Sequence, residues 1–267
     1  MISFPPGLAE GEGMDPQGKL RALVGAARRA VIFTGAGMST DSGIPDFRSP
    51  SGLWTRMKPI PFDEFISSEA VRRESWRRRF EGDDTLTAAS PNAGHYAVTA
   101  LLTKGYARCV LTQNVDDLHR RAGVDPDALI ELHGNSTYAS CLSCGQRYEL
   151  AALKAAFEAT GTVPPCDACG GIVKSATISF GQAMPEGPMA RAAEAIAACD
   201  LCLVLGSSLQ VYPAAAFPEE AARRGVPLVI INREATPLDE LAELVWHEGI
   251  AEALAVLDDL PTLELAL

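Results

Sequence analysis

Short apolar runs recur along the chain, and each is ended by glycine or by polar residues. They lie at residues 31–34, 109–112, 128–130 with Leu132, 201–205 and 228–231. Runs of this length are typical of strands buried on both faces. Helical patterns lie between several of them, at 186–199 and at 214–224. Strands that alternate with helices predict an α/β fold with a parallel, doubly wound sheet.

The first helix is predicted just after residue 14. Asp15 and Pro16 suit an N-cap and a first helical turn. The apolar residues that follow are at helical spacing, namely Leu20, Leu23, Val24 and Ala27. Residues 1–14 are rich in Gly, Pro and Glu, and we interpret them as a loose N-terminal arm.

Two regions do not fit the alternation of strands and helices. Residues 47–90 hold several aromatic residues and an arginine cluster, and we interpret them as a helical or irregular insert. Residues 136–175 hold four cysteines in two pairs. The length of 267 residues suits one large domain that carries such inserts.

Composition and charge exclude several classes of protein. The chain has 23 basic and 34 acidic residues, a formal net charge of −11, which argues against binding nucleic acid by neutralising phosphates. No apolar run is long enough for a transmembrane helix, and the N-terminal residues lack the pattern of a secretory signal. We therefore expect a cytoplasmic protein with neither a nucleic-acid nor a membrane partner.

The cysteine spacing predicts a metal site. Cys141 and Cys144 form one CxxC pair, and Cys166 and Cys169 form a second after 21 residues. Two such pairs can close a tetrahedral four-sulfur site around Zn²⁺ and leave no position for water, which favours a structural zinc. The alternative is two unrelated redox or buried pairs. We expect the other three of the seven cysteines, at 109, 199 and 202, to be core thiols.

Polar loops follow three of the predicted strands. They are Gly35-Ala36-Gly37, Gly206-Ser207-Ser208, and the segment with Asn232 and Glu234. Such loops at the carboxyl ends of parallel strands are where an open α/β sheet holds a dinucleotide. The glycine loop taken alone is equally compatible with a tight turn that binds nothing.

Two further groups follow predicted strands. Gln113, Asn114, Val115 and Asp116 offer amides and a carboxylate for hydrogen bonds to a ribose or a carboxamide, although Asp116 also suits an Asx turn capping a helix at 117–121. His133 follows the third strand and is placed for proton transfer near neutral pH, although a lone histidine is more often structural. We interpret the other histidines, at 95, 119 and 247, as non-catalytic.

Together these pieces resemble the sirtuin family of NAD-dependent protein deacylases. The matching segments stand in the family's order: GAGMSTDSGIPDFRSPSGLW at 35–54, PNAGH at 91–95, TQNVDDLHRRAG at 112–123, ELHGN at 131–135, the CxxC pairs, SFGQAMP at 179–185, GSSLQVYPAA at 206–215 and INREATP at 231–237. The resemblance implies a Rossmann-like domain formed by 15–46, 91–135 and 176–260. It also implies a smaller inserted domain made of a helical insert, 47–90, and a zinc-binding module, 136–175.

The resemblance also implies roles for individual residues. His133 and Asn114 would be catalytic, with neutral His133 the general base on the ribose hydroxyls. Phe180 and Gly181 would pair with the substrate peptide. The implied NAD-binding residues are Gly35, Ala36, Gly37, Ser39, Asp46, Phe47, Arg48, Gln113, Asn114, Val115, Asp116, Gly206, Ser207, Ser208, Asn232, Glu234 and Ile250.

The implied reaction moves the acyl group of an acyl-lysine protein or peptide to NAD, giving nicotinamide, O-acyl-ADP-ribose and free lysine. The segment 76–80 lacks the Tyr-x-x-Arg pair of members that select acidic acyl groups, so we expect no preference for succinyl-lysine. The alternatives are a protein mono-ADP-ribosyltransferase and a non-catalytic, zinc-stabilised NAD-binding module. The sequence leaves the physiological substrate, the preferred acyl chain and the oligomeric state open.

Overall fold

A parallel sheet of six strands forms the larger part of the molecule. The computed structural model describes residues 15–46, 52 and 57–264. In spatial order the strands are β3 (Leu129–Glu131), β2 (Ala107–Thr112), β1 (Ala30–Thr34), β7 (Leu201–Leu205), β8 (Leu228–Ile231) and β9 (Leu244–Trp246). Every neighbouring pair is parallel. All residues of β1, β7 and β8 are buried, as continuous apolar runs predict.

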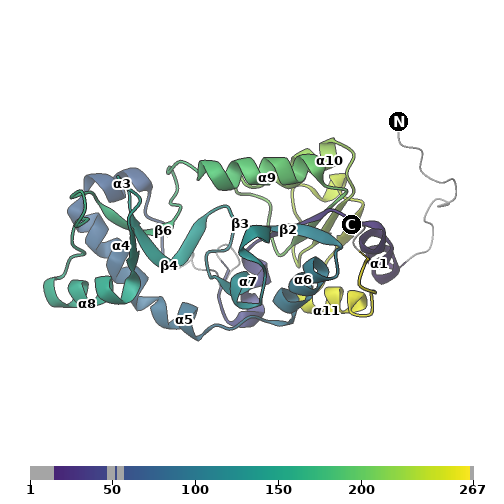
Figure 1. Ribbon diagram of the computed structural model, residues 1–267, viewed down its shortest axis with the longest axis horizontal. Coiled ribbons are helices and arrows are strands. Elements are labelled where there is room, and N and C mark those ends of the chain that lie inside the picture. Colours follow the sequence, from purple (N-terminus) through teal and green to yellow (C-terminus); the bar gives the residue numbers. More distant parts are fainter. Residues whose placement is uncertain (1–14, 47–51, 53–56, 265–267) are drawn as a thin grey trace.

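Helices cover both faces of this sheet (Figure 1). On one face lie α1 (Pro16–Ala26), α6 (Ala93–Thr103) and α11 (Ile250–Leu254), and on the other lie α9 (Glu186–Ala198) and α10 (Ala216–Arg223). As predicted, Asp15 caps α1, with its carboxylate accepting from the Gly18 amide at 2.7 Å. The expected doubly wound parallel sheet is therefore confirmed.

The smaller part of the molecule lies at the other end of Figure 1. It contains an antiparallel three-stranded sheet with the order β5 (Arg147–Glu149), β4 (Gly134–Cys141) and β6 (Val173–Thr177). Its helices are α3 (Phe62–Ser67), α4 (Glu69–Glu81), α5 (Asp83–Ala88) and α8 (Leu150–Thr160). Trp76 and Phe80 of α4 pack with Leu153 and Phe157 of α8 in one apolar cluster, which joins the two segments that the alternation did not explain.

The remaining short elements lie around the ends of the strands. They are α7 (Leu118–Arg121) and the 3₁₀ turns at Ala36–Met38, Thr40–Ser42, Pro126–Ala128, Asp239–Leu241 and Ala255–Leu257. The helix α8, the edge strand β9 and the small sheet have no counterpart in the predicted elements. No helix in the described ranges has both the length and the apolar character that crossing a membrane requires.

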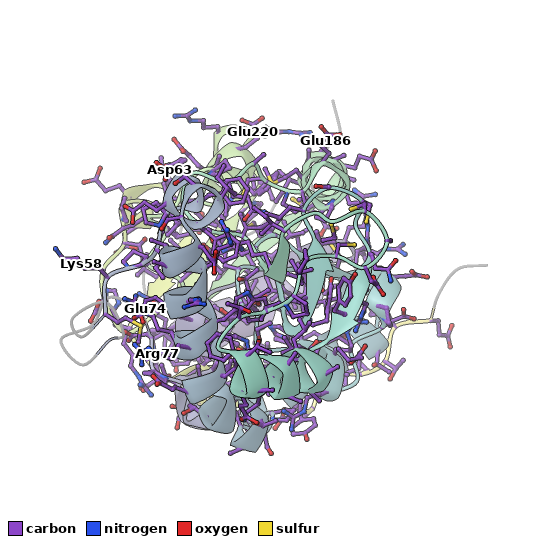
Figure 2. All side chains as sticks on the ribbon, turned by 90° about the vertical axis from the view of Figure 1, so that its left-hand side faces the viewer. Lys58, Asp63, Glu74, Arg77, Glu186 and Glu220 are labelled. Atoms are coloured by element: carbon purple, nitrogen blue, oxygen red, sulfur yellow. The ribbon has the colours of Figure 1, made fainter. Side chains whose placement is uncertain are left out.

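Two arginines of the cluster in the helical insert, Arg77 and Arg78, pair with glutamates of their own helix, whereas Arg79 donates to the Ser136 carbonyl. Arg77 forms ion pairs with Glu74 at 2.8 Å and with Glu81 at 2.5 Å, and Arg78 pairs with Glu74 at 2.6 Å. Hydrogen bonds from Arg77 and Arg78 lower the pKa of Glu74 to about 2. Figure 2 shows Glu74 and Arg77 side by side on the outer surface of α4. Arg77 and Arg78 therefore form solvent-exposed ion pairs, each of which contributes little to stability in water.

Candidate active site

Two glycine loops interlock at the carboxyl ends of β1 and β7. The Gly37 amide donates to the Gly206 carbonyl at 2.8 Å, and the Gly35 amide donates to the Leu205 carbonyl at 3.1 Å. A Cβ atom on Gly37 would lie 2.8 Å from the Gly206 Cα, and one on Gly206 would lie 2.4 Å from the Met38 nitrogen. The glycines are therefore required first by the contact between the loops, because any side chain would separate them.

The Asn114 side chain ties a second loop to the first. Its amide nitrogen donates to the Gly35 carbonyl at 2.9 Å and to the Ser39 hydroxyl oxygen at 3.2 Å. The Ser39 hydroxyl in turn donates to Asp116 at 2.6 Å. Asn114, Ser39 and Asp116 are all buried, at 9%, 1% and 8% exposure. The loop after β2 is thus held against the loop after β1 by side chains from both.

Asp116 makes the helix-starting contact that its sequence position suggested, and it also holds Ser39. One carboxylate oxygen accepts from Ser39, and the other accepts from the Leu118 amide at 3.0 Å, the first residue of α7. Burial raises the pKa of Asp116, while these hydrogen bonds favour the ionised form. The carboxylate therefore starts a helix and faces the Asn114 loop at the same time.

His133 is held in one tautomer. Its Nδ1 lies 3.1 Å from the Gln113 carbonyl oxygen, which can only accept, so Nδ1 carries the proton and Nε2 is left as the basic nitrogen. Burial lowers the pKa of His133, which keeps the ring neutral at pH 7. The Gln113 side chain donates to the Ser207 hydroxyl at 2.8 Å, so the histidine is connected to the loops after both β2 and β7. This is the state required of a general base.

The backbone on the other side of His133 passes from the large sheet into the small one. Gly134 starts β4 with a φ of 74°, and a Cβ there would lie 2.0 Å from the Ala176 carbonyl oxygen. The Ile178 amide donates to the His133 carbonyl at 2.8 Å. His133 is therefore fixed by the large sheet through its ring and by the β6 segment through its backbone.

Two histidines that we interpreted as non-catalytic lie buried behind these loops. His95 and His119 face each other with ring centroids 4.9 Å apart, at 0% and 2% exposure. The Thr34 hydroxyl donates to the Thr112 hydroxyl at 2.8 Å, so it accepts from His119 Nε2 at 3.0 Å. The Thr112 hydroxyl oxygen in turn accepts from the Asn114 backbone amide at 3.0 Å. Burial lowers the pKa of His95 to about 4 and that of His119 to about 3. The neutral His119 ring is therefore connected to the Asn114 loop through Thr34 and Thr112.

Asn92 is a further supporting residue that the sequence reasoning missed. It caps α6 in a capping box with His95, and its side-chain nitrogen donates to the Met38 carbonyl at 2.9 Å and to Ser42 at 3.0 Å. The signal was present in the segment PNAGH, where Asn and His stand three residues apart as a capping box requires.

The four paired cysteines converge in the small sheet. Their Sγ atoms all lie within 4.8 Å of one another, with 3.5 Å between Cys141 and Cys169 and 3.6 Å between Cys144 and Cys166. A tetrahedral zinc with Zn–S bonds of about 2.3 Å places its sulfurs roughly 3.8 Å apart, so the cluster fits that ion. Cys109, Cys199 and Cys202 are buried in the large core, as predicted.

The other predicted site residues are spread along the same edge of the large sheet and beyond it. Asn232 follows β8 and donates to the Glu234 carbonyl at 2.7 Å, and Ile250 is buried against Gly94. The amide of Ala36 is the one of the Gly35–Gly37 trio with no backbone acceptor among the described residues. Val115 lies in the loop after β2, and Ser207 and Ser208 lie in the loop after β7, whereas Asp46 is the last described residue before position 47. Phe47 and Arg48 lie outside the described residues.

The two residues assigned to the substrate peptide lie after β6. Phe180 is 47% exposed, and its carbonyl accepts from the Phe62 amide of α3 at 2.9 Å. Gly181 has a φ of 80°, with no atom near the position of a Cβ. This segment therefore connects the helical insert with the end of the small sheet.

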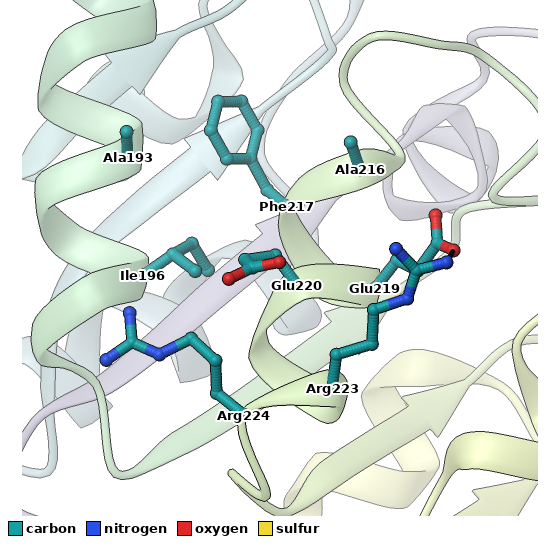
Figure 3. A pocket seen from close by; sticks show the side chains of 8 residues that line it. All are labelled: Ala193, Ile196, Ala216, Phe217, Glu219, Glu220, Arg223 and Arg224. Carbon is teal, nitrogen blue, oxygen red and sulfur yellow. Dashed lines mark ion pairs between the residues drawn. The ribbon is translucent and has the colours of Figure 1, made fainter.

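A cavity of about 430 Å³ lies away from all these residues, between α9 and α10 (Figure 3). Its walls include Ile196, Phe217 and the Glu219–Arg223 ion pair at 2.5 Å. None of its lining residues is a predicted site residue.

Comparisons with known proteins agree with this geometry. The model of the Sir2 family matches residues 35–213. The "NAD-dependent protein deacetylase 1" of Bradyrhizobium diazoefficiens is 52% identical over 236 residues, which cover 88% of this chain and 92% of that protein. The solved structure "Sir2-p53 peptide-NAD+" has a TM-score of 0.79 at 34% identity, covering 89% of this chain and 95% of that one. A structure of "Sir2Tm bound to a propionylated peptide" has the same TM-score and identity, with 89% and 94% covered.

Proposed function

The chain belongs to the Sir2 family, and we propose that it uses His133 as the general base of an NAD-dependent protein-lysine deacylase. The enzyme moves an acyl group, acetyl in the first instance, from a lysine side chain to the ADP-ribose part of NAD. One water is consumed, and the products are free lysine, nicotinamide and O-acyl-ADP-ribose. NAD supplies a ribose carbon with a neutral leaving group, and a ribose hydroxyl that receives the acyl group.

The observation that carries the proposal is the tautomer of His133. The Nδ1–H bond to the Gln113 carbonyl leaves Nε2 unprotonated, and burial lowers the pKa of the ring. Nε2 can therefore take the proton of a ribose hydroxyl when that oxygen attacks the acyl carbon. Loss of nicotinamide precedes this step and needs no base from the protein.

The interlocked loops are the proposed NAD site. The Ala36 amide and its neighbours lie where the pyrophosphate would approach the start of a helical turn. Asn114, Val115 and Asp116 would line the nicotinamide pocket, and Gln113 with Ser207 would bind the adjoining ribose. The segment with Asn232, Glu234 and Ile250 would border the adenosine half. Phe180 and Gly181 would receive the acyl-lysine peptide as an added strand.

The cysteine cluster holds a structural Zn²⁺ by this proposal. Four thiolates leave no open position for a substrate, so the ion would order β4 and the loop after α8 without taking part in the reaction. A cytoplasmic location is part of the same proposal, since the seven thiols are unpaired and zinc thiolates persist in a reducing compartment.

Mass spectrometry with an acetyl-lysine peptide and NAD tests the reaction. Loss of the acetyl group together with O-acetyl-ADP-ribose is the expected result. A peptide that gains ADP-ribose would instead support a mono-ADP-ribosyltransferase. No product with any of several acyl chains would support a binding module.

The variant His133→Ala tests the assigned base. We expect it to bind NAD as the wild type does and to lose roughly 10²–10⁴-fold in deacylation, the usual contribution of a positioned general base. Calorimetric NAD titration and product assays measure the two quantities. Unchanged deacylation would falsify the assignment. Glu158→Ala, at an exposed position on α8 and outside the loops after β1, β2 and β7, is the control.

A further inference from the structure

One lysine of the small sheet is buried without an acidic partner. Lys174 lies on β6 and is 4% exposed. Among the ion pairs of the described residues none involves Lys174, and its ammonium instead donates to the carbonyl oxygens of Thr177 at 2.5 Å and Ser175 at 3.4 Å. A buried cation without a carboxylate is costly, so its position requires a physical reason.

The Thr177 carbonyl belongs to a peptide group that also reaches His133. The amide of that same group is the Ile178 N–H, which donates to the His133 carbonyl at 2.8 Å. One planar peptide unit therefore accepts from Lys174 at its oxygen and donates to His133 at its nitrogen. Hydrogen bonds in such a chain polarise one another, and a charged donor at one end strengthens the bond at the other.

The Lys174 ammonium is surrounded by neutral groups. Lys174 stands opposite Ser140 in the β4–β6 ladder, and its ammonium lies 5.9 Å from the centroid of the Phe65 ring of α3. Burial lowers the pKa of Lys174 to about 8, so the group is still a cation near pH 7. The aromatic face and the carbonyl oxygens are the groups that compensate its charge.

We propose that Lys174 is a positioning residue for the catalytic base, holding the His133 backbone through the Thr177–Ile178 peptide group. The inference rests on the proposed function, because it assigns Lys174 to the step that His133 performs. The close approach of Gly134 to Ala176 confines the same stretch of backbone, so rotation of this peptide unit is transmitted to His133. The ring then meets Gln113 at a set angle from the other side.

The test separates the two stages of the reaction in the zinc-loaded enzyme. Exchange of labelled nicotinamide into NAD reports cleavage at the ribose, which needs no base, and O-acetyl-ADP-ribose formation reports the step that does. Lys174→Met keeps an unbranched apolar side chain of nearly the same length and removes the ammonium group. We expect its kcat for deacylation to fall about tenfold, as for a base displaced by a fraction of an ångström, with nicotinamide exchange and the KM for NAD within about twofold of the wild type.

Two further variants test whether the loss in Lys174→Met comes from the missing cation at this position. Lys174→Arg retains a cation that can reach the Thr177 carbonyl, and its deacylation should lie between that of the wild type and that of Lys174→Met. Lys154→Met makes the same substitution on α8 in the same small part of the molecule and should behave as wild type. Zinc content and the thermal unfolding midpoint show whether each variant is folded.

The outcomes distinguish the inference from the proposed function. Equal losses in exchange and in deacylation, or no loss in either, would overturn the positioning role, as would a Lys174→Arg variant no better than Lys174→Met. If the wild type forms no O-acetyl-ADP-ribose, the proposed function itself fails, whatever the variants do.

Discussion

The two sheets of this protein are stabilised in different ways, and the proposed reaction site lies where they join. The parallel sheet has fully buried strands between two large apolar clusters, which include Ile32 of β1 and Val204 of β7. The antiparallel sheet has one small cluster around Trp76, an edge strand with exposed residues, and four cysteines. Apolar burial is sufficient for the first, whereas the second needs a metal to compensate for its small core.

The comparison also explains why the base is fixed from two directions. The His133 ring is bound by a loop of the large sheet, and its backbone is bound by the strand end of the small one. Each sheet alone would leave one of these contacts unmade. The small sheet, although remote from the loops proposed to bind NAD, therefore helps to fix the position of the proposed base.

Removing one zinc ligand should have the largest effect. Cys141→Ala should lose the metal, whose binding contributes on the order of 10 kcal/mol to small zinc modules, and deacylation should fall at least 100-fold or so. We expect metal analysis to find no zinc, and hydrogen exchange to show an unprotected β4–β6 ladder beside an intact six-stranded sheet.

The control for this variant is Cys199→Ala, which removes a thiol from the large core and should retain the zinc. If Cys141→Ala were zinc-free yet folded and fully active, the small sheet would not depend on the metal, and the contrast between the two sheets would disappear.

Much of this contrast was visible in the sequence, and the rest depends on tertiary contacts. Continuous apolar runs predicted five strands of the large sheet, and cysteine spacing predicted the metal cluster. The edge strand β9 escaped because its apolar run, Leu244–Trp246, is only three residues long. Helix α8 escaped although Leu150, Leu153 and Phe157 lie on one helical face. The small sheet's strands carry mixed burial, which weakens any alternation.

The supporting residues of the site were the hardest to predict. A lysine such as Lys174 is expected at the surface, and tertiary contacts that the sequence does not show, among them that with the Phe65 ring of α3, bury it. His95 and His119 become a pair because α6 and α7 meet, which neither segment shows alone. In contrast, the site residues that follow strands were predictable, since parallel strands bring their carboxyl ends to one edge.

Acid should have a smaller effect, lowering the free energy of unfolding of the large sheet through its buried histidines. In the unfolded chain His95 and His119 titrate near pH 6.5, whereas in the fold burial lowers their pKa values to about 4 and about 3. The unfolded chain therefore binds protons first, and stability that is complete above about pH 6.5 is lost as the pH falls toward these values. Urea denaturation at pH 7 and pH 5 should differ by on the order of 2–4 kcal/mol from this pair.

The variant His119→Phe isolates this contribution. It cannot bind a proton, so its free energy of unfolding should change less between the two pH values, although it starts lower because Thr34 loses a partner. A pH dependence as steep in His119→Phe as in the wild type would assign the acid sensitivity to other groups. Zinc retention, measured in parallel, reports the separate loss of the small sheet.

The smallest effect should come from a hydroxyl beside the metal ligands. The Tyr148 hydroxyl lies 3.1 Å from Cys166 Sγ and also contacts Asp167, which orients that thiolate. Tyr148→Phe should speed the capture of zinc by a chelator on the order of tenfold while leaving the thermal midpoint of the large sheet unchanged. Tyr138→Phe, in the neighbouring strand, is the matched control. Equal release rates in both variants would show that the hydroxyl does not hold the ligand.

Because the two glycine loops interlock, the site that they form cannot be separated from the rest of the fold. One loop follows the first strand of the chain, and its counterpart follows β7, after the whole small sheet has been built. No single contiguous segment of the chain therefore contains the whole of this edge. It cannot be excised as a peptide or grafted as a motif, and a chain cut anywhere between the two loops has to be reassembled from both pieces before that edge exists.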